Sequence, residues 1–561
     1  FGKISQDGLL ASLYDFENGN IFEAVHSSYK ISLLTLGSAA ISEFVCFAKE
    51  VKQINDSRRR FSLKPSEFQL INPNTLTCPM FRSEKDAELT KKLYRTAPVL
   101  IKEAIYAEEG GKRKLVESEV NPWGARFTQG LFNMASDSGL FKNEPTQDRY
   151  PLYEAKLIHQ FDHRYATFIP TAGLKNADWP SRDLTLDVKA SFNNAVTPRY
   201  WVDKREVWLQ VARLPDGLIK ALKDRHEPGV LLMVAWILFG QWLSRHAEQG
   251  VYPAWQAFTK HHPFAHALSP VSMGLCGDNP ASLTPLNDNY LPGQATAEVE
   301  AANDRQQPGW FLVDGVCLSR MLQTTQLYAS LFEDVAVLQT VDDALAFAET
   351  LLEKSSPRWL MGWRRIARAT DERTLISGLF PLSAVGDNMA LIFSDVSFAP
   401  RQFALLYGNL NSLVTDYVAR QKFGGATLNH FYTKQFPILP PDHYTEADLA
   451  YIVPRVLELT YTAHDMAAWA QDLGHSGTPF PFNPDRRAQL RAELDAYYAR
   501  LYGLTRDELR YILDPSDVMG DDYPSETFRV LKNGELREFG EYRTQRLVLA
   551  AWDALHSREA A

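Results

Sequence analysis

The sequence predicts a multidomain α+β protein, and three observations support this fold class. The chain has 561 residues, which at about 150 residues per domain is enough for several domains. Short runs rich in Phe, Tyr, Ile and Val between residues 11 and 48 indicate β-strands. Apolar residues at helical spacing fill residues 206–355 and 443–561. We therefore expect a mixed α/β region that is interrupted by a helical insert and followed by a helical carboxy-terminal region.

Residues 1–50 are expected to hold a β-hairpin. The turn residues Asn18-Gly19-Asn20 separate two runs rich in aromatic and β-branched residues, with 29–36 as the return strand. The next segment is basic, because 49–64 contains six Lys and Arg residues against two acidic residues, a net charge of +4. Such a run either contacts phosphate or forms a solvated basic surface.

Residues 51–205 and 356–442 are expected to form irregular α+β structure. From 121 to 201 the chain is rich in aromatic residues, Pro and Gly, a pattern typical of loop-rich binding surfaces. In the second part, 390–395 predicts a short buried strand. The segment 403–425 predicts one amphipathic helix that ends at its two glycines.

The two remaining segments are expected to be helical. Residues 206–355 form the helical insert, whose middle part, 269–308, is rich in Gly, Pro, Asn and Asp and predicts a long loop. Residues 443–561 contain further amphipathic helices. The sequence thus divides into five predicted segments: 1–50, 51–205, 206–355, 356–442 and 443–561.

Composition excludes several classes of protein. Hydrophobic residues make up 45% of the chain and charged residues 23%, which is typical of a globular protein and excludes a wholly disordered, collagen-like or coiled-coil chain. The formal net charge of −9 excludes a basic surface over the whole chain. Any nucleic-acid site therefore has to be local.

Cysteine usage and apolar stretches predict a cytoplasmic protein without a membrane partner. Cys46, Cys78, Cys276 and Cys317 form no CxxC pair, so we expect reduced thiols rather than a disulfide scaffold or a zinc ribbon. The longest apolar stretch, 229–240, is shorter than the roughly 20 residues that cross a bilayer. The chain opens with no signal peptide.

The chain carries none of the common catalytic motifs. It lacks the GxxxxGK[ST], GxGxxG, HExxH and GxSxG patterns. One spacing is typical of a metal site, because His159 and His163 would share one face of a helix, with Asp162 beside them. The alternative interpretation is that these histidines are hydrogen-bonded within a packed domain, and we expect no bound metal.

Several segments together resemble one known family. They are 13–36, 71–94, 121–141, 151–168, 198–201, 364–381, 409–441 and 528–553. These segments resemble the carboxy-terminal half of large adenine-specific DNA methyltransferases of the type IIG-like class, found in restriction–modification and phage-defence systems such as BREX and DISARM. The resemblance covers most of the chain except the insert 206–355, and 409–441 is its most specific segment.

The resemblance implies that the catalytic motifs lie outside this chain. In the family an amino-terminal domain binds S-adenosylmethionine, and an Asn-Pro-Pro-Tyr loop holds the flipped adenine. Neither motif occurs here. Residues 1–50 would be the end of the methyltransferase sheet, and the rest would recognise the DNA target. The chain begins with Phe1 rather than Met, so we expect a piece of a longer polypeptide or a processed chain.

The implied partners are double-stranded DNA, the amino-terminal methyltransferase domain or subunit, which binds S-adenosylmethionine, and other defence-system proteins. Candidate phosphate contacts are Arg58, Arg59, Arg60, Lys64, Lys91 and Lys92, with a second cluster at Arg364, Arg365, Arg368 and Arg373. Candidate contacts to base edges are Arg82, Asn429 and His430, and candidates for stacking on a flipped base are Phe22 and Tyr29. For each residue the alternative is an ordinary ion pair, cap or core contact.

Three hypotheses remain open at this point. In the first, the chain is the recognition part of one methyltransferase polypeptide. In the second, it is a free-standing specificity subunit that positions DNA for a separate methyltransferase or nuclease. A third hypothesis makes His159, Asp162 and His163 the centre of a metal-dependent nuclease. The target sequence cannot be deduced, because no code relates side chains to bases without a docking geometry.

Overall fold

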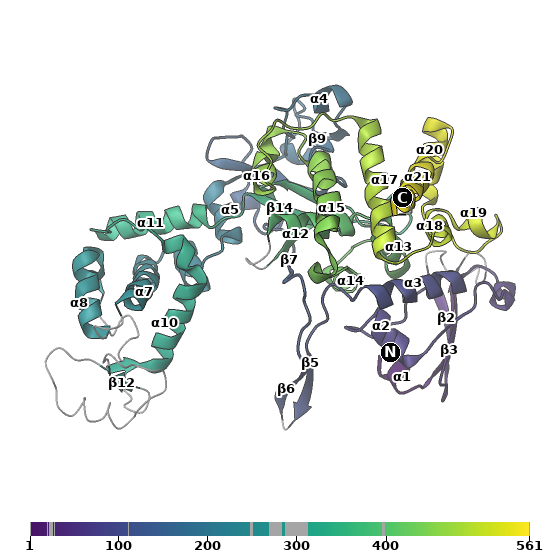
Figure 1. Ribbon diagram of the computed structural model, residues 1–561, viewed down its shortest axis with the longest axis horizontal. Helices are drawn as coiled ribbons and strands as arrows, with labels where there is room; N and C mark the ends of the chain where they lie inside the picture. The colour runs from purple at the N-terminus through teal and green to yellow at the C-terminus, as the bar shows by residue number, and fades with distance from the viewer. Residues whose placement is uncertain are drawn as a thin grey trace. The chain divides into compact units, whose positions relative to one another are not determined.

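The computed structural model has a multidomain α+β fold (Figure 1). It describes residues 2–18, 21, 26, 29–109, 111–246, 251–268, 283–285, 312–394 and 399–559. The chain divides into two compact units. Unit 1 comprises Phe1–Thr146, Tyr150–Trp201 and Arg358–Ala561, and unit 2 comprises Gln147–Arg149 and Val202–Pro357. The predicted helical insert is therefore a compact unit of its own, whereas the other four predicted segments share unit 1.

The amino-terminal part of unit 1 is a four-stranded mixed sheet. Its elements are α1 (Gly2–Gln6), β1 (Leu10–Glu17), β2 (Lys30–Leu36), β3 (Ser42–Ala48) and β4 (Phe61–Leu63), with the 3-10 helix η1 (Val51–Asn55) before β4. The strand order is β2-β1-β3-β4. β1 pairs antiparallel with β2, with Tyr14 opposite Leu33, and parallel with β3. The predicted hairpin is confirmed, although its turn at 19 and 20 lies outside the described residues.

Aromatic packing fixes two helices on this sheet. The helices are α2 (Pro65–Ile71) and α3 (Glu84–Thr96). The Phe44 ring of β3 stacks on Phe61 with 5.2 Å between centroids and meets Phe68 of α2 edge-on. α3 begins at Ser83, whose hydroxyl accepts the Asp86 N–H.

The chain then forms a two-stranded ribbon of β5 (Ile105–Glu109) and β6 (Lys112–Glu117), which projects from unit 1 (Figure 1).

A second antiparallel sheet forms the centre of unit 1. Its strands are β7 (Arg126–Thr128), β14 (Trp359–Arg364), β15 (Ser377–Pro381) and β17 (Met389–Phe393), in the order β15-β14-β17-β7. The predicted strand at 390–395 is confirmed as far as Phe393, and 395 lies outside the described residues. Shorter elements outside these two sheets are η2 (Ser138–Leu140), β8 (Arg149–Tyr153), η3 (Ala155–Leu157), β9 (Ala166–Phe168), η4 (Asn176–Asp178), β10 (Ser181–Asp183), α4 (Leu186–Ala190), β11 (Trp201–Asp203) and β16 (Ala384–Val385).

The single amphipathic helix predicted at 403–425 is wrong, because the segment forms two helices. α12 spans Pro400–Leu410 and α13 spans Leu413–Lys422. Asn411 and Ser412 separate them, and the Ser412 hydroxyl accepts the Thr415 N–H as the N-cap of α13. Almost every side chain of both helices is buried. The apolar periodicity of the segment therefore reflects two core helices rather than one surface helix.

The carboxy-terminal segment is mainly helical, as predicted. After α14 (His430–Thr433) and η9 (Pro441–His443), its elements are α15 (Glu446–Thr460), η10 (His464–Met466), α16 (Ala467–Asp472), α17 (Pro484–Leu501), α18 (Arg506–Leu513), α19 (Pro515–Met519), α20 (Arg529–Phe539) and α21 (Arg543–Glu559). Side-chain caps at Thr445 and Thr505 start α15 and α18. One hydrophobic core joins these helices to both sheets. The buried Asp86 carboxylate of α3 accepts hydrogen bonds from Tyr417 and Tyr511 and so ties the sheet region to the helices.

Unit 2 is a helical unit around one apolar helix. Its elements are α5 (Lys204–Val211), α6 (Asp216–Lys223), α7 (Glu227–Arg245), α8 (Val251–His261), η6 (Pro263–Ala267), β12 (Leu283–Pro285), β13 (Leu312–Asp314), α10 (Gly315–Tyr328), η8 (Ala329–Phe332) and α11 (Val341–Lys354). In the described part of the chain, α7 is the one helix long and apolar enough to cross a membrane. It packs against α6, α8, α10 and α11, so its apolar side chains form the core of this unit.

The predicted loop at 269–308 lies mostly outside the described residues. Its described part is the strand β12, which pairs antiparallel with β13.

Candidate nucleic-acid interface

The basic segment at 58–60 is neutralised by acidic side chains that the fold brings to it. Arg58 donates to the Asp522 carboxylate at 2.8 Å and to Asp56 at 3.0 Å. Arg60 donates to Glu43 on β3 at 3.1 Å. Arg59 is half-buried, and burial lowers the pKa of its guanidinium. The +4 of the sequence therefore does not become a field of the same size at the surface.

The other basic candidates in this part of unit 1 have different environments. Lys91 is 6% exposed and lies between the carboxylates of Glu67 and Glu88. Lys92 pairs with Glu508 of α18 at 2.6 Å. Lys64 is exposed where α2 begins, and the Arg82 guanidinium lies 4.3 Å from the centroid of the Phe47 ring. Of these four residues, Lys64 is the most accessible to a phosphate.

The two residues predicted to stack on a flipped base have different outcomes. Tyr29 is 64% exposed immediately before β2. The alternative interpretation, core packing, therefore does not apply to Tyr29 in this structure. Phe22 lies outside the described residues.

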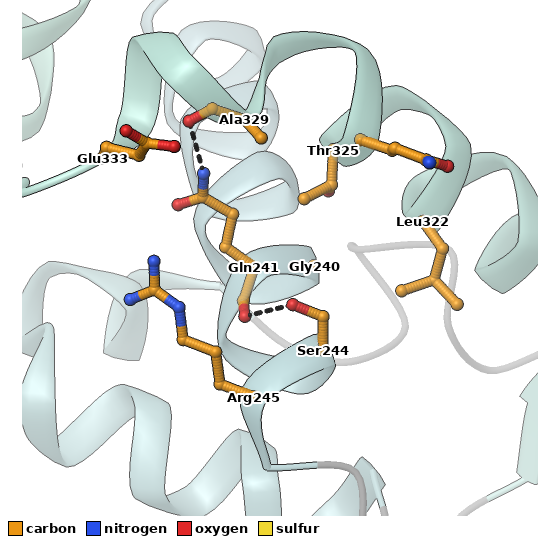
Figure 2. Close-up of a pocket in the computed structure, with 9 residues that line it drawn as sticks. Gly240, Gln241, Ser244, Arg245, Leu322, Thr325, Ala329 and Glu333 are labelled. Atoms are coloured by element: carbon orange, nitrogen blue, oxygen red, sulfur yellow. Dashed lines mark hydrogen bonds between the residues drawn. The ribbon is translucent and has the colours of Figure 1, made fainter.

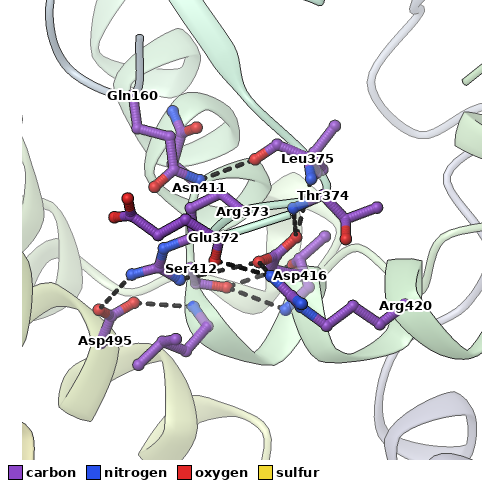
Figure 3. A network of polar contacts seen from close by, with 12 residues as sticks. Gln160, Glu372, Arg373, Thr374, Leu375, Asn411, Ser412, Asp416, Arg420 and Asp495 are labelled. Carbon is purple, nitrogen blue, oxygen red and sulfur yellow. Dashed lines mark hydrogen bonds and ion pairs between the residues drawn. The ribbon is translucent and has the colours of Figure 1, made fainter. Parts of the chain in front are cut away.

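In the second cluster, Arg364 is half-buried and Arg373 is buried. Arg364 donates to the Ile158 carbonyl at 2.9 Å and lies over the Tyr165 ring, and burial lowers its pKa. The side chain of Arg373 is 2% exposed. Its guanidinium is 3.9 Å from a carboxylate oxygen of Asp416 and of Asp495 (Figure 3). Arg373 therefore contacts protein carboxylates rather than the surface.

The buried charge network around Arg373 joins several backbone segments (Figure 3). Asp416 of α13 accepts the backbone N–H groups of Thr374 and Leu375, both at 2.8 Å. Asp495 of α17 accepts the Leu413 N–H at the start of α13, also at 2.8 Å. Burial raises the pKa of Asp495. The network holds the segment before β15 against two helices, and Arg373 and Arg420 balance its negative charge.

Arg365 lies in a short pairing of two segments that come from far apart in the chain. The Leu428 N–H donates to the Arg365 carbonyl at 2.6 Å, and the Ala367 N–H donates to the Ala426 carbonyl at 3.3 Å. Asn429 follows immediately as the N-cap of α14. This pairing brings Arg365 beside Asn429 and His430. All three residues are predicted from the sequence as DNA contacts.

The Arg365 guanidinium is held in one orientation. Nη2 donates to the Asn429 side-chain oxygen at 3.1 Å, and Nη1 donates to the Asp387 carbonyl at 2.5 Å. The Gln129 amide, with its oxygen turned toward Arg365, accepts from both Nη atoms. The side chain is half-buried. Each Nη atom makes two of these bonds, which is its full donor capacity, so the Nε N–H is the donor that remains for a ligand.

His430 is positioned by aromatic rings. Its ring lies 5.6 Å from the Phe127 centroid and 5.5 Å from the Trp363 centroid. Burial lowers the pKa of His430, and the charges of Arg365 and Lys434 lower it further. The imidazole is therefore neutral at pH 7, when one ring nitrogen donates and the other accepts.

Exposed residues complete a small surface around Arg365. Ile366 is 62% exposed, Phe431 is 48% exposed and Arg368 is also exposed. We use the term Arg365 surface for Arg365, Ile366, Arg368, Asn429, His430 and Phe431. The sequence reasoning missed Phe431 and the supporting Gln129. Phe431 adjoins the predicted His430, whereas nothing in the sequence around Gln129 connects it with Arg365.

The spacing His159, Asp162 and His163 does not form a ligand cluster. The Asp162 carboxylate pairs with Lys189 at 2.6 Å, and the His163 ring bonds Asp465 at 2.8 Å. In the described ranges, no group of three or more His, Cys, Asp or Glu side chains is placed to hold a metal ion. These residues act in packing and in ion pairs.

A hollow in unit 2 lies between α7 and α10 (Figure 2). Gln241 donates to the Ala329 carbonyl at 2.9 Å, and the Ser244 hydroxyl donates to the Gln241 carbonyl at 2.8 Å. Arg245 and Glu333 also line it. Because the Ser244 hydroxyl bonds a backbone carbonyl rather than a general base, the arrangement does not create a nucleophile.

The sequence matches no protein-family model and aligns significantly with no curated protein.

Proposed function

We propose that this chain recognises the DNA target of a S-adenosylmethionine-dependent, adenine-specific DNA methyltransferase in a restriction–modification or phage-defence system. The observation that carries the proposal is the Arg365 surface, where Arg365, Asn429 and His430 meet although the chain supplies them from two distant segments. The proposal also rests on the resemblance of 409–441 and the other segments to this family. It places the protein in the cytoplasm with the DNA.

The chemistry of the Arg365 surface suits duplex DNA. A planar guanidinium matches the two acceptors of guanine once its Nη donors exchange the bonds to Asp387 and Gln129 for bonds to the base, and an asparagine amide matches adenine. The exposed Arg368 is suited to a phosphate, which fixes the position of the duplex without reading sequence. His430 packs against Phe127 and Trp363, and its Nε2 atom is buried without a hydrogen-bond partner among the described residues, so it supports the surface rather than reading a base. Arg365 and Asn429 are therefore assigned to bases, and Arg368 to the backbone.

The edge strand β2 supports a methyltransferase domain as partner. Among the described strands β2 is at the edge of its sheet, and its consecutive residues Leu33 and Leu34 are 54% and 49% exposed. Consecutive residues of a strand point to opposite faces, so both faces are apolar. Strands that are apolar on both faces are typical of the interior of an α/β sheet. In the proposal, the domain that supplies the adjoining strands binds S-adenosylmethionine.

DNA binding by the chain tests the proposal. A pool of random-sequence duplexes is incubated with the protein at moderate salt, with and without S-adenosylmethionine, and the retained DNA is sequenced. We expect one short motif to be enriched equally in both conditions, and Arg365→Ala to remove the enrichment by relaxing the base that it contacts.

Arg529→Ala on α20 is the matched control, because the Arg529 side chain is 59% exposed and pairs with Glu526, three residues earlier. It should leave the motif unchanged. Binding that is equally strong for every sequence, or the same enriched motif with Arg365→Ala, would contradict the assignment of Arg365 to base recognition.

A further inference from the structure

A strained bulge interrupts β3 where it pairs with β1. The pairing shifts between Tyr14 and Phe16, so Asp15 of β1 faces two residues of β3, Cys46 and Phe47. Phe47 has a φ of 58°, in the left-handed region that residues other than glycine seldom adopt. Bulges re-aim side chains, and they and strained residues are over-represented at functional sites. The bulge therefore sets the direction of the Phe47 side chain at a cost in backbone strain.

Two cations lie over the Phe47 ring. The Lys30 ammonium of β2 is 4.9 Å from the ring centroid, and the Arg82 guanidinium is 4.3 Å from it. Both distances are those of cation–π contacts. Lys30 is exposed and Arg82 is half-buried. We use the term Phe47 site for Lys30, Phe47 and Arg82, where one ring holds two like charges close to each other.

In the part of the chain that the structure describes, neither cation has a carboxylate partner. Glu17 lies opposite Lys30 in the β1–β2 pairing, but its carboxylate lies 3.9 Å from the Lys49 ammonium. Asp15 is 4% exposed, and one of its oxygens accepts the Ser32 hydroxyl at 3.0 Å. The nearest acids on the sheet are therefore engaged elsewhere.

The charges around the Phe47 site leave a small positive surplus. Its charged chain neighbours and their ion-pair partners have a net charge of +1, from Asp15, Glu17, Asp56, Glu84 and Asp522 against Lys30, Lys49, Arg58, Arg59, Arg82 and Lys85. Asp56 and Asp522 both pair with Arg58, and Arg59 lies 4.0 Å from Asp56. Lys30 and Arg82 thus keep their N–H donors for a ligand.

A phosphate group suits these donors. The guanidinium of Arg82 presents a planar fork that matches two oxygens of a phosphate, and a lysine ammonium binds phosphate as a point charge. A phosphate is tetrahedral, so its oxygens can face two side chains that approach from different directions. Its negative charge also relieves the repulsion between the two cations over one ring.

We propose that Lys30 and Arg82 bind one phosphate group at the Phe47 site, supplied by the backbone of double-stranded DNA or by free phosphate. With DNA as the source, this inference rests on the proposed function. It assigns Arg82 to a phosphate rather than to a base edge. Phe47 is a positioning residue, because its ring holds both cations without contacting the phosphate.

The Phe47 site and the Arg365 surface lie toward opposite ends of α3. Arg82 precedes this helix, and Tyr94 in its last turn donates to the Gln435 carbonyl at 2.6 Å, five residues after His430. The 13 residues of α3 span about 20 Å at 1.5 Å per residue. This length corresponds to about six base pairs, so one duplex is long enough to reach both places.

The first measurement is the salt dependence of duplex binding by the full chain. Lys30→Gln/Arg82→Gln should lower the slope of log affinity against log salt by about one, the value for one phosphate contact. The matched control is Lys175→Gln/Arg529→Gln, which removes one exposed lysine and one exposed arginine elsewhere in unit 1 and should leave the slope unchanged. A fall of about two would show two separate phosphates and overturn the proposal.

The second measurement uses inorganic phosphate as the probe. Calorimetric titration at constant ionic strength, with chloride as the reference anion, should show saturable binding that Lys30→Gln/Arg82→Gln abolishes. Displacement of this phosphate by a duplex identifies the DNA backbone as the source, whereas binding that a duplex does not affect identifies free phosphate. If the double variant changes neither the slope nor phosphate binding, the proposal is wrong.

The third measurement tests Phe47 as the positioning residue. Phe47→Leu keeps both cations and an apolar side chain, so the salt slope should stay the same while affinity falls about fivefold with the loss of two cation–π contacts. Phe47→Tyr keeps the ring and should restore the affinity. Equal affinities of Phe47→Leu and the wild type would show that the ring does not position the cations.

The two proposals fail in different ways. If Arg365→Ala abolishes motif enrichment but Lys30→Gln/Arg82→Gln changes neither the slope nor phosphate binding, the inference is wrong and the proposed function stands. If the chain binds inorganic phosphate through Lys30 and Arg82 but binds no duplex at low salt, the Phe47 site stands and the proposed function is wrong.

Discussion

Arginine has two uses in unit 1, and its surroundings separate them. Arg373 is enclosed by two carboxylates and the Phe528 ring, so its charge balances buried acids. Arg365 is half-buried, and a carbonyl and two amides orient its guanidinium at the Arg365 surface. The first arrangement stabilises the fold, whereas the second holds a guanidinium in one orientation at the Arg365 surface.

Removing the buried charge should therefore destabilise unit 1. Arg373→Met removes the cation that lies 3.9 Å from both Asp416 and Asp495 and leaves Asp416 with Arg420 alone, and loss of one partner of a buried ion pair costs about 3 kcal/mol or more. Arg368→Met, at an exposed position five residues earlier in the same cluster, should change the free energy of unfolding by less than about 0.5 kcal/mol. Denaturant unfolding of the full chain measures both, and equal effects would contradict the distinction.

His262 in unit 2 should make stability depend on pH. Its Nδ1 accepts the Leu338 N–H at 3.2 Å, and burial, with a smaller contribution from His261, lowers the pKa of His262 to about 4. In the unfolded chain a histidine titrates near about 6.5. Below that pH the unfolded state binds the proton first, so the contribution of His262 to stability is complete above about pH 6.5 and is lost as the pH falls to about 4.

The measurement is the hydrogen-exchange protection of α8 and α11 as a function of pH. His262→Gln keeps a side-chain acceptor for the Leu338 N–H but cannot titrate, so its protection should fall less between pH 6.5 and 4 than that of the wild type. Parallel pH profiles of the two proteins would show that His262 does not control this transition.

The sequence alone does not show which basic residues face solvent. The basic run at 58–60 is visible in the sequence, but one of the two acids that pair with Arg58 is Asp522, 464 residues later in the chain. Likewise, Lys91 looks like any helical lysine until Glu67 is placed beside it. Charge pairing across such separations depends on the tertiary fold, so a local count of charge cannot distinguish a phosphate contact from an internal ion pair.

At the scale of elements, local patterns predicted the parts of the chain whose structure has local causes. The β1–β2 hairpin and the carboxy-terminal helices have turn residues, caps and apolar periods in their own sequence. The break between α12 and α13 was missed, because the apolar pattern continues on both sides of Asn411 and Ser412. Ser412 is a helix-starting residue that the continuous pattern concealed.

The contact between α7 and α10 depends on a glycine. A Cβ atom on Gly240 would overlap the Thr325 side chain and lie 3.3 Å from Met321 (Figure 2 labels Gly240 and Thr325). Gly240→Leu should therefore force the helices apart and destabilise unit 2 by about 2 kcal/mol, even after the gain in helix propensity. Hydrogen exchange of unit 2 measures the loss.

Gly534 in α20 is the matched control, since no heavy atom lies within 4 Å of a Cβ built there. Gly534→Ala should stabilise the helix by about 1 kcal/mol, because alanine is the better helix former. If Gly240→Leu also stabilised the protein, the close approach of α7 and α10 would not be a constraint on this position.

At the scale of the whole molecule, sequence segments and compact units do not coincide. The five predicted segments become two units, because the amino-terminal sheet, the central sheet and the carboxy-terminal helices share one hydrophobic core. The insert was separable in the sequence because its helical period interrupts an irregular region. The hydrogen bond between Asp86 and Tyr511 shows that α3 packs with a helix more than 400 residues away. No periodicity in the sequence predicts this contact.

The two ends of the helical part of unit 2 lie close together, so this part can be removed from the chain as an insertion. The Arg213 N–H donates to the Ser355 carbonyl at 3.1 Å, so the two ends of the helical part lie next to each other. The cores of the two units are separate clusters of side chains. Replacing 214–354 by two glycines, with Leu209→Gln to remove an apolar side chain of the lost core, should therefore leave unit 1 folded.

DNA affinity of this shortened chain tests where the recognition surface ends. If unit 1 contains the whole site, affinity should stay within about twofold of the wild type, because the described residues that are deleted share no hydrophobic cluster with unit 1. Hydrogen exchange of unit 1 serves as the control for folding. A large loss of affinity with normal protection of unit 1 would show that unit 2 contributes contacts to the duplex, since folding and the Arg365 surface would both be intact.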